Sequence, residues 1–360
     1  MSLEFAQRIR RIPVYPAADG YALDSNFAML ASNESPEPPL PAVVEAARAA
    51  LGTVNRYPDP SSARLRTRLG ERYGVPAARI AIGNGSCDIL LAAGEALLEP
   101  GAEFVYAWPS FSVYPHLAAA SGATPVTVPL DAAERHDLGA MADAITVATR
   151  LVIVCNPNNP TSTAHGLDAI AGFVAQVPRN VAVIVDEAYC EFNLLSDPDE
   201  SLALLSDLPN LVLLRTFSKV YGLCGLRVGF GLCGSEDFRM AVDQVRQPFY
   251  ANAAAQAAAL EALDHQDEVA ARVERTLAER LKLEDGLREL GLAPAESQAN
   301  FVWFGLGEDR DEAAIVSGLA ERRVLVRAGT ALGRERFLRV TVGRPDENRR
   351  LLDGLGALLA

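Results

Sequence analysis

The sequence is short of lysine and of positive charge, and it has no long apolar run. Its 46 acidic residues outnumber the 33 basic ones, which gives a net charge of −13 at pH 7. Because nucleic acids and anionic membranes attract a basic face, we expect neither to be a main partner. No stretch reaches the roughly 18 apolar residues of a membrane span, and residues 1–11 lack the apolar core of a signal peptide. These absences favour a cytoplasmic protein whose partners are small molecules.

Cysteine and histidine are also scarce and scattered. The five cysteines are odd in number and never form a CxxC pair, and the four histidines are isolated from one another. This usage is typical of reduced thiols in a cytoplasm rather than of a disulfide framework or a zinc site. We therefore expect no structural disulfide and no metal. The residues concerned are Cys87, Cys155, Cys190, Cys224, Cys233, His116, His136, His165 and His265.

Between about residues 80 and 233, the chain contains a series of short apolar runs separated by helical or loop segments. Several runs are rich in Val, Ile and Leu without polar alternation, which is typical of strands covered on both faces. The pattern predicts an α/β fold with a large, mostly parallel seven-stranded sheet flanked by helices. The predicted strands are Arg79–Ile82, Glu103–Ala107, Thr124–Val128, Leu151–Cys155, Val181–Val185, Leu211–Leu214 and Arg227–Leu232, and the helices between them include Asp88–Leu98, Phe111–Ala120 and Leu167–Gln176.

We place the large domain at residues 41–250. Residues 251–360 predict a smaller α+β domain, because helical and strand-like segments alternate there after one long helical region. Residues 1–40 are rich in proline and indicate an arm that belongs to the small domain rather than a domain of its own. The small domain is predicted to contain a helical region at 252–290, strands at 300–305, 324–327 and 337–342, and helices at 311–321 and 347–359.

Lysine occurs only twice, at Lys219 and Lys282, whereas arginine supplies every other basic side chain. Lys282 lies in a charged helical stretch, where a solvated surface position is expected. Lys219 instead follows the apolar run 211–214 and precedes a glycine-rich stretch. Lysine, unlike arginine, can lose its proton and act as an amine nucleophile that forms a Schiff base. A chance surface lysine remains the alternative, but the pattern makes Lys219 the candidate nucleophile.

Polar motifs follow the predicted strands, at the edge where open α/β sheets bind ligands. Residues 83–88 (GNGSCD) open a helix whose free N–H groups suit a phosphate, although a plain turn fits equally well. Residues 156–161 (NPNNPT) form a polar loop that is either a ligand contact or an ordinary turn. Asp186 ends a five-residue apolar run, where burying a carboxylate is costly unless it pairs with a cation or a hydrogen-bond donor. A structural N-cap is the alternative for Asp186.

Thr216, Ser218 and Arg227, together with residues 83–88, would form a phosphate cup. A phosphate cup, a reactive lysine and a strand-end aspartate are the parts that hold pyridoxal 5′-phosphate. With these parts the chain resembles a known family, the histidinol-phosphate aminotransferase group of fold-type I pyridoxal-phosphate-dependent aminotransferases. The resemblance rests on an ordered set of segments over nearly the whole length: 32–36 (SNESP), 55–59 (NRYPD), 83–86 (GNGS), 158–161 (NNPT), 186–189 (DEAY), 215–219 (RTFSK), 225–229 (GLRVG), 297–301 (SQANF) and 338–343 (LRVTVG).

The resemblance implies cofactor-binding and catalytic roles for individual residues. Lys219 would form the Schiff base and then move a proton, and Asp186 would keep the pyridine nitrogen protonated. Tyr189 and Asn159 would donate hydrogen bonds to the ring hydroxyl oxygen. Phe111 would stack on the cofactor ring, with simple core packing as its alternative. The phosphate cup would consist of Ser86, the backbone of Cys87, Thr216, Ser218 and Arg227.

The resemblance also implies how substrate and partner bind. Arg339 would hold the carboxylate or the distal anionic group of the substrate, with Arg327 as a second cation. Tyr15 and Asn33 would face the substrate from the amino-terminal arm. Tyr57 would reach the cofactor phosphate of the neighbouring subunit, which implies a homodimer with shared active sites.

The chain departs from the family's pattern at four positions. Ser35 stands where asparagine is usual, Ser162 replaces a glycine, Cys87 takes a common acidic position, and Cys224 replaces an alanine. The departures leave the catalytic residues untouched. Ser35 and Cys87 bear on specificity, because they are expected close to the substrate and the phosphate.

The resemblance implies an enzyme that transfers an amino group between an amino donor and a 2-oxo acid through pyridoxal phosphate. Histidinol phosphate with 2-oxoglutarate, as in histidine biosynthesis, is the leading pair. An aromatic amino acid aminotransferase is the alternative within the class. A decarboxylase or β-lyase on the same scaffold and a non-catalytic ligand-binding protein are the alternatives from other classes.

Overall fold

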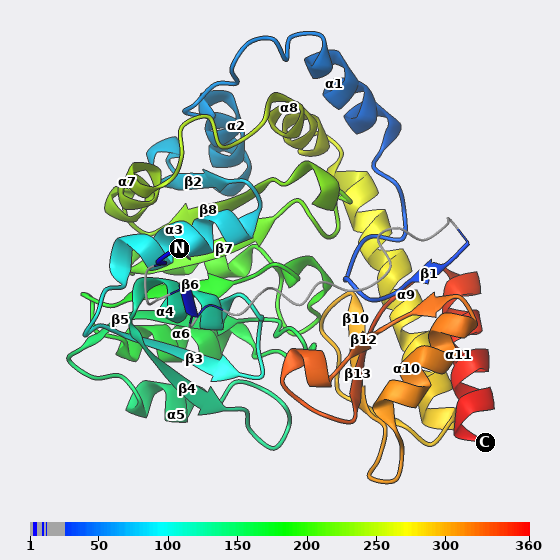
Figure 1. Cartoon of the computed structure of the whole chain (residues 1–360). Coiled ribbons are helices and arrows are strands. Elements are labelled where there is room, and N and C mark those ends of the chain that lie inside the picture. The colour runs from blue at the N-terminus through cyan, green and yellow to red at the C-terminus, as the bar shows by residue number, and fades with distance from the viewer. Residues whose placement is uncertain (1–2, 6–8, 11, 13–25) are drawn as a thin grey trace.

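The computed structural model describes residues 3–5, 9–10, 12 and 26–360. A sheet of seven strands, ordered β2-β8-β7-β6-β5-β3-β4, forms the centre of the larger part of the molecule (Figure 1). Its strands are β2 (Ile80–Gly83), β3 (Glu103–Trp108), β4 (Thr124–Pro129), β5 (Thr149–Cys155), β6 (Ala182–Asp186), β7 (Leu211–Thr216) and β8 (Gly229–Cys233). Neighbouring strands are parallel except for β8, which runs antiparallel to β2 and β7. The predicted α/β fold is therefore confirmed.

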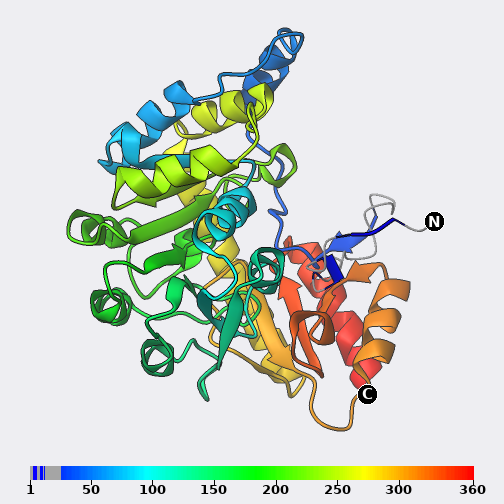
Figure 2. The same cartoon turned by 60° about the vertical axis from the view of Figure 1, so that its left-hand side comes forward.

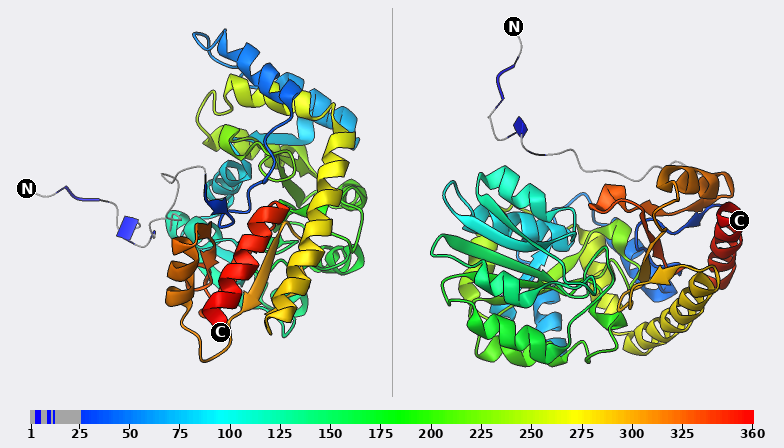
Figure 3. Two further views of the ribbon diagram at one scale, coloured as in Figure 1. Left: turned by 90° about the vertical axis from the view of Figure 1, so that its right-hand side faces the viewer. Right: turned by 90° about the horizontal axis from the view of Figure 1, so that it is seen from below.

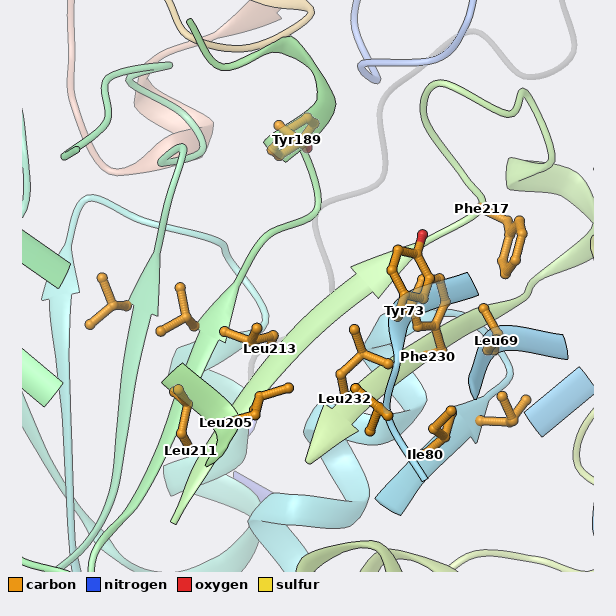
Figure 4. Packing of buried hydrophobic residues seen from close by; sticks show 14 of the residues in the cluster. Leu69, Tyr73, Ile80, Tyr189, Leu205, Leu211, Leu213, Phe217, Phe230 and Leu232 are labelled. Atoms are coloured by element: carbon orange, nitrogen blue, oxygen red, sulfur yellow. The ribbon is translucent and has the colours of Figure 1, made fainter. Parts of the chain in front are cut away.

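Both faces of this sheet are buried, which explains why its strands lack polar alternation. Successive side chains point to opposite faces, so Leu151 and Ile153 of β5 join one core cluster, whereas Val152 and Val154 join the other. Helices on the first face are α3 (Ser86–Leu97), α4 (Tyr114–Ser121) and α7 (Glu236–Val245); those on the second are α2 (Ala63–Tyr73), α5 (Leu138–Asp143), α6 (Leu167–Gln176) and α8 (Ala253–Ala262). Figure 4 shows Tyr73 of α2 beside Phe230 of β8 on this second face.

A second, smaller unit lies beside the large sheet (Figure 2). We call it the small-sheet unit, and it has its own core cluster. Its sheet runs β12-β13-β10-β9, and a separate pair joins β1 of the arm to β11. The elements are β1 (Ala28–Met29), α9 (Gln266–Glu289), β9 (Ala293–Pro294), β10 (Phe301–Gly305), α10 (Glu312–Glu321), β11 (Val324–Leu325), β12 (Arg327–Ala328), β13 (Phe337–Thr341) and α11 (Pro345–Leu359). Figure 3 shows the long helix α9 beside α11. Among the described residues, no helix combines the length and apolar character needed to cross a membrane.

Two predicted segments are divided in the structure. The helical region 252–290 is interrupted between α8 and α9, because α8 packs on α1 (Pro41–Leu51) and α2, whereas α9 packs on β9, β10 and α11 of the small-sheet unit. The predicted strand 324–327 is shared between two sheets: β11 pairs with β1, and β12 pairs with β13. In both cases the elements on which the segment packs or with which it pairs are distant in the sequence, and they decide where it is divided.

Candidate active site

A cavity of about 380 Å³ lies at the carboxyl ends of β5, β6 and β7. This is the edge at which open α/β sheets bind ligands, because loops from several strands converge there. Every predicted site residue except Tyr15 and Tyr57 lines it: Asn33, Ser86, Cys87, Phe111, Asn159, Asp186, Tyr189, Thr216, Ser218, Lys219, Arg227, Arg327 and Arg339. The fold thus brings together residues that are up to 306 positions apart in the sequence (339 − 33).

Lys219 follows β7 and its amine points to the amino-terminal segment. Its Nζ donates to the backbone oxygens of Asn33 at 3.0 Å and Ser32 at 3.4 Å. Burial, and after it the positive charge of Arg339, lowers the pKa of Lys219 to about 8. The neutral amine, which is the nucleophilic form, is therefore well populated near neutral pH.

Asp186 is the last residue of β6 and is only 3% exposed. Its carboxylate accepts hydrogen bonds from the Tyr114 hydroxyl at 2.9 Å and from the Ala188 N–H at 3.3 Å. Both donors are neutral, and burial raises the pKa of Asp186 to about 6. A buried carboxylate of this kind is stabilised by a cationic group that enters the cavity, and a protonated pyridine nitrogen is such a group.

Two hydrogen-bonded groups of side chains line the cavity together with Lys219. Arg339 donates to the Asn159 side chain and to the Ala31 carbonyl oxygen, both at 2.6 Å. Asn33 donates to the Tyr189 hydroxyl at 3.2 Å, and burial raises the pKa of that phenol well above its ordinary value. Tyr189 therefore stays protonated and can donate a hydrogen bond to an oxygen in the cavity.

The start of α3 forms a cradle for an anion. Gly85 precedes the helix with φ +82°, and no side chain caps the N–H groups of the first turn. A Cβ at Gly85 would lie 2.3 Å from Arg227 Nη2, and one at Gly229 would lie 2.4 Å from the backbone nitrogen of Ser86. The two glycines are needed because the backbone and the Arg227 guanidinium approach so closely. Free N–H groups beside an arginine fit a phosphate.

Thr216 and Ser218 add two hydroxyls to the cradle. The Thr216 hydroxyl donates to Ser218 Oγ at 2.9 Å and accepts from the Ser218 N–H at 3.0 Å. Both side chains line the same cavity as Ser86 and Arg227. The donor set and the cradle therefore fit a phosphate such as that of pyridoxal phosphate, and Lys219 and Asp186 line the same cavity.

Arg327 and Arg339 form the cationic wall of the cavity. They are directly opposite each other in the antiparallel pair of β12 and β13, so their side chains leave the sheet on the same face. Both line the cavity, and Leu332, in the connection between the two strands, lines it as well. Two guanidinium groups at one rim suit a carboxylate or another anion.

Two predicted site residues are not among the residues that line the cavity, one because the structure places it on the surface and the other because it is not described. Tyr57 is 80% exposed and stacks on Phe249, with ring centroids 4.3 Å apart. Its predicted role concerns a neighbouring subunit and stays a prediction. Tyr15 lies outside the described residues.

The four departures from the family's pattern fall into two groups. Ser35 and Ser162 make local hydrogen bonds, to the Glu37 and Thr161 carbonyl oxygens. Cys87 and Cys224 line the cavity, and burial raises the pKa of the Cys87 thiol to about 11. Cys87 is therefore a neutral thiol beside the phosphate cradle at physiological pH.

Sequence reasoning missed Tyr114 and Leu332. Tyr114 is fully buried and holds Asp186, and its ring meets Phe111 edge-to-face at 5.7 Å. The one available signal was its position three residues after Phe111, at the start of a helix. No pattern in the sequence marks Leu332, because its place depends on how β12 and β13 are joined.

Comparison with known proteins gives the same family along the whole chain. The model of the family described as aminotransferase class I and II matches residues 25–355. An aromatic amino acid aminotransferase of Cutibacterium acnes is 41% identical over 99% of this chain and 98% of its own length. Histidinol-phosphate aminotransferase 2 of Pseudomonas aeruginosa is 43% identical over 98% of this chain and 92% of its own length.

A solved structure agrees with these sequence relatives. Histidinol-phosphate aminotransferase from Sinorhizobium meliloti, in complex with pyridoxal 5′-phosphate, superposes with a TM-score of 0.87 at 27% identity, covering 100% of this chain and 98% of its own. The cavity described above is thus found in a chain whose fold and sequence both match one family. The chain belongs to the class I and II aminotransferases.

Proposed function

We propose that this chain is a pyridoxal-phosphate-dependent aminotransferase that moves an amino group between an aromatic amino acid and a 2-oxo acid. The observation that carries the proposal is the cavity, in which Lys219, with its lowered pKa, shares one space with Arg327 and Arg339. The amine can attach to an aldehyde, and the arginines can hold a substrate carboxylate beside it.

The cofactor supplies an aldehyde that accepts amino groups and a ring that withdraws electrons from the substrate's Cα. Lys219 Nζ would hold the cofactor through its aldehyde and, when free, would carry the proton at the substrate's Cα. Asp186 would keep a proton on the ring nitrogen, because its buried carboxylate favours a cationic partner. Tyr189 and Asn159 would donate hydrogen bonds to the ring hydroxyl oxygen, and Arg227 would hold the phosphate.

The substrate preference departs from the sequence-based expectation, which put histidinol phosphate first. The Cutibacterium acnes relative, an aromatic amino acid aminotransferase, matches this chain over nearly the full length of both. The apolar side chain of Leu332 lines the cavity and would contact the aromatic ring of a substrate, while Arg339 would bind its carboxylate. The Pseudomonas aeruginosa relative keeps histidinol phosphate as the second candidate.

Steady-state kinetics with 2-oxoglutarate as amino acceptor test the preference. We expect kcat/KM for tyrosine or phenylalanine to exceed that for histidinol phosphate. The reverse order would replace the aromatic assignment with the second candidate. Lys219→Ala is the control for catalysis, because it should bind the cofactor's phosphate group and yet transfer no amino group. Release of carbon dioxide without amino transfer would refute the aminotransferase reaction itself.

We also propose that the enzyme acts as a homodimer in which Tyr57 reaches the neighbouring active site. Tyr57, Leu51 and Val54, which lie within seven residues of one another in the sequence, are 80%, 58% and 61% exposed, and Tyr57 stacks on Phe249. Exposed apolar groups of this kind are typical of subunit interfaces. Analytical ultracentrifugation should show a dimer. Tyr57→Phe should weaken cofactor binding while the protein stays dimeric. A monomer that retains full activity would refute both statements.

A further inference from the structure

The connection from β12 to β13 carries three cavity residues on one hairpin, which we call the arginine hairpin (residues 327–341). Arg327 and Arg339 lie on its two strands, and Leu332 lies in the 3₁₀ turn η6 (Thr330–Leu332) between them. The tip follows directly, at Gly333 and Arg334. In Figure 1 this connection lies on the side of the small sheet that faces the large sheet.

The first contact of the tip is Gly333 against Trp108, the last residue of β3. Gly333 has φ +92°, and a Cβ there would lie 2.7–2.8 Å from three atoms of the Trp108 indole. No other residue could bring its backbone so close to the ring in this left-handed conformation. The tip therefore rests directly on the large-sheet part of the molecule.

The second contact is an ion pair between Arg334 of the tip and Glu134, in the loop that follows β4. Arg334 Nη2 lies 2.9 Å from Glu134 Oε1. The same guanidinium lies over the Phe337 ring at 4.8 Å, and Phe337 stacks on Trp303 with centroids 5.0 Å apart. Trp303 is the strand partner of Arg339 in β10 and β13. A continuous set of contacts thus joins Glu134 to the strand that carries Arg339.

Glu134 lies in a segment that is hydrogen-bonded to the loop after β5, which carries Asn159. Its carbonyl oxygen accepts a hydrogen bond from Thr163 Oγ1 at 2.6 Å, and His136 Nε2 is 3.0 Å from Asn158 Oδ1. These bonds fasten residues 134–136 to the loop that carries Asn159, the hydrogen-bond partner of Arg339. The large-sheet part therefore holds the arginine hairpin at its tip and at one of its arginines.

We propose that Glu134 and Gly333 are positioning residues, which hold the arginine hairpin so that Arg327 and Arg339 face the substrate carboxylate. The inference rests on the proposed function, since it takes these arginines to bind substrate. Neither Glu134 nor Gly333 lines the cavity. Both act through the hairpin, and their loss should affect substrate binding rather than the cofactor or the chemical step.

The holoenzyme variants Glu134→Gln and Gly333→Ala test this. We expect KM for 2-oxoglutarate and for the amino donor to rise about tenfold, as small misplacements of binding groups do. We expect kcat to stay within about twofold, and the visible absorbance of the bound cofactor to stay unchanged. The chain's two tryptophans, Trp108 and Trp303, both lie in this contact, so acrylamide quenching of their fluorescence should increase in both variants.

Two variants serve as matched controls. Gly307→Ala introduces the same backbone strain, at φ +91°, where a Cβ meets no atom within 4 Å. Asp285→Asn removes one charge and the exposed ion pair with Arg288 on α9. Neither should change KM or quenching. If Gly333→Ala does not fold, Glu134→Gln still tests the proposal, because it adds no heavy atom to the interior.

The outcomes separate the inference from the proposed function. Increased quenching with unchanged KM would show a loosened tip that does not position the arginines, and would overturn the proposal. Unchanged quenching in Glu134→Gln would overturn it as well, whatever the kinetics. Wild-type enzyme that transfers no amino group would refute the proposed function, whereas the quenching comparison needs no turnover.

Discussion

The lowered pKa of Lys219 gives a quantitative test of the active-site chemistry. The cause of the shift is burial of the amine, followed by the positive charge of Arg339. Both disfavour the ammonium form. Replacing Arg339 by glutamine removes the second cause and keeps a polar side chain, so the pKa of Lys219 should rise towards its ordinary value.

The magnitude follows from the displacement of the pKa from 10.5 to about 8. At pH 7.5 about a quarter of the Lys219 side chains would then be neutral, against about 0.1% at the ordinary value, a roughly 200-fold larger population of the nucleophile. Reactivity of the amine towards an acylating reagent should rise with pH, reach half of its maximum near pH 8, and then level off.

The scarcity of lysine makes the assay direct. Trace acetylation of the cofactor-free protein at a series of pH values, followed by peptide mass spectrometry, reports Lys219 and Lys282 separately. Lys282 has a side chain that is 72% exposed and provides a reference for reagent decay in the same tube. A midpoint for Lys219 at or above pH 10, or no upward movement in Arg339→Gln, would refute the reasoning.

Three further perturbations probe the rest of the site. Asp186→Asn should abolish amino transfer, yet raise the unfolding free energy of the cofactor-free protein at pH 7 by on the order of 3 kcal/mol. The sign follows because the folded pKa of about 6 exceeds the ordinary 3.8, so ionised Asp186 destabilises the fold at pH 7; this penalty decreases as the pH falls below 6 and is gone below 3.8. Gly85→Ala should displace the Arg227 guanidinium from the cradle and weaken cofactor binding about 10- to 100-fold, as lost charge-assisted hydrogen bonds do. Glu187→Ala should lower the unfolding free energy by on the order of 3 kcal/mol, because it leaves buried Arg215, 2.8 Å away, short of a partner.

Each of these has a control and an outcome that contradicts it. Gly74 has a φ of +67° and open space where a Cβ would lie, so Gly74→Ala should leave the affinity for the cofactor unchanged. If Gly74→Ala and Gly85→Ala lose the same affinity, backbone strain is the cause and not displacement of Arg227. Urea titrations measure the two stability effects. A lower unfolding free energy of Asp186→Asn at pH 7, or an unchanged unfolding free energy of Glu187→Ala, would contradict the electrostatic arguments.

Particular residues show how far the sequence could be read. The scarcity of lysine singled out Lys219 without any structure, and the end of an apolar run singled out Asp186, since chemistry limits which residue types can fill those positions. The strands of the large sheet were recognisable because burial on both faces removes polar residues from them. The ordered motifs then indicated the family, but they put histidinol phosphate first among the substrates, whereas relatives of similar identity carry either name.

The contacts between segments that are distant in the sequence were decided only by the tertiary structure. Asn33 bonds to Tyr189 and Arg339 bonds to Asn159. Tyr114 holds Asp186, and the arginine hairpin rests on Trp108 and Glu134. The sequence by itself determined the elements and the reactive groups, because periodicity and side-chain chemistry are local properties. The pKa values, the cavity and the docking of the hairpin arise from burial and from partners far along the chain, which exist only once the sheets have packed together.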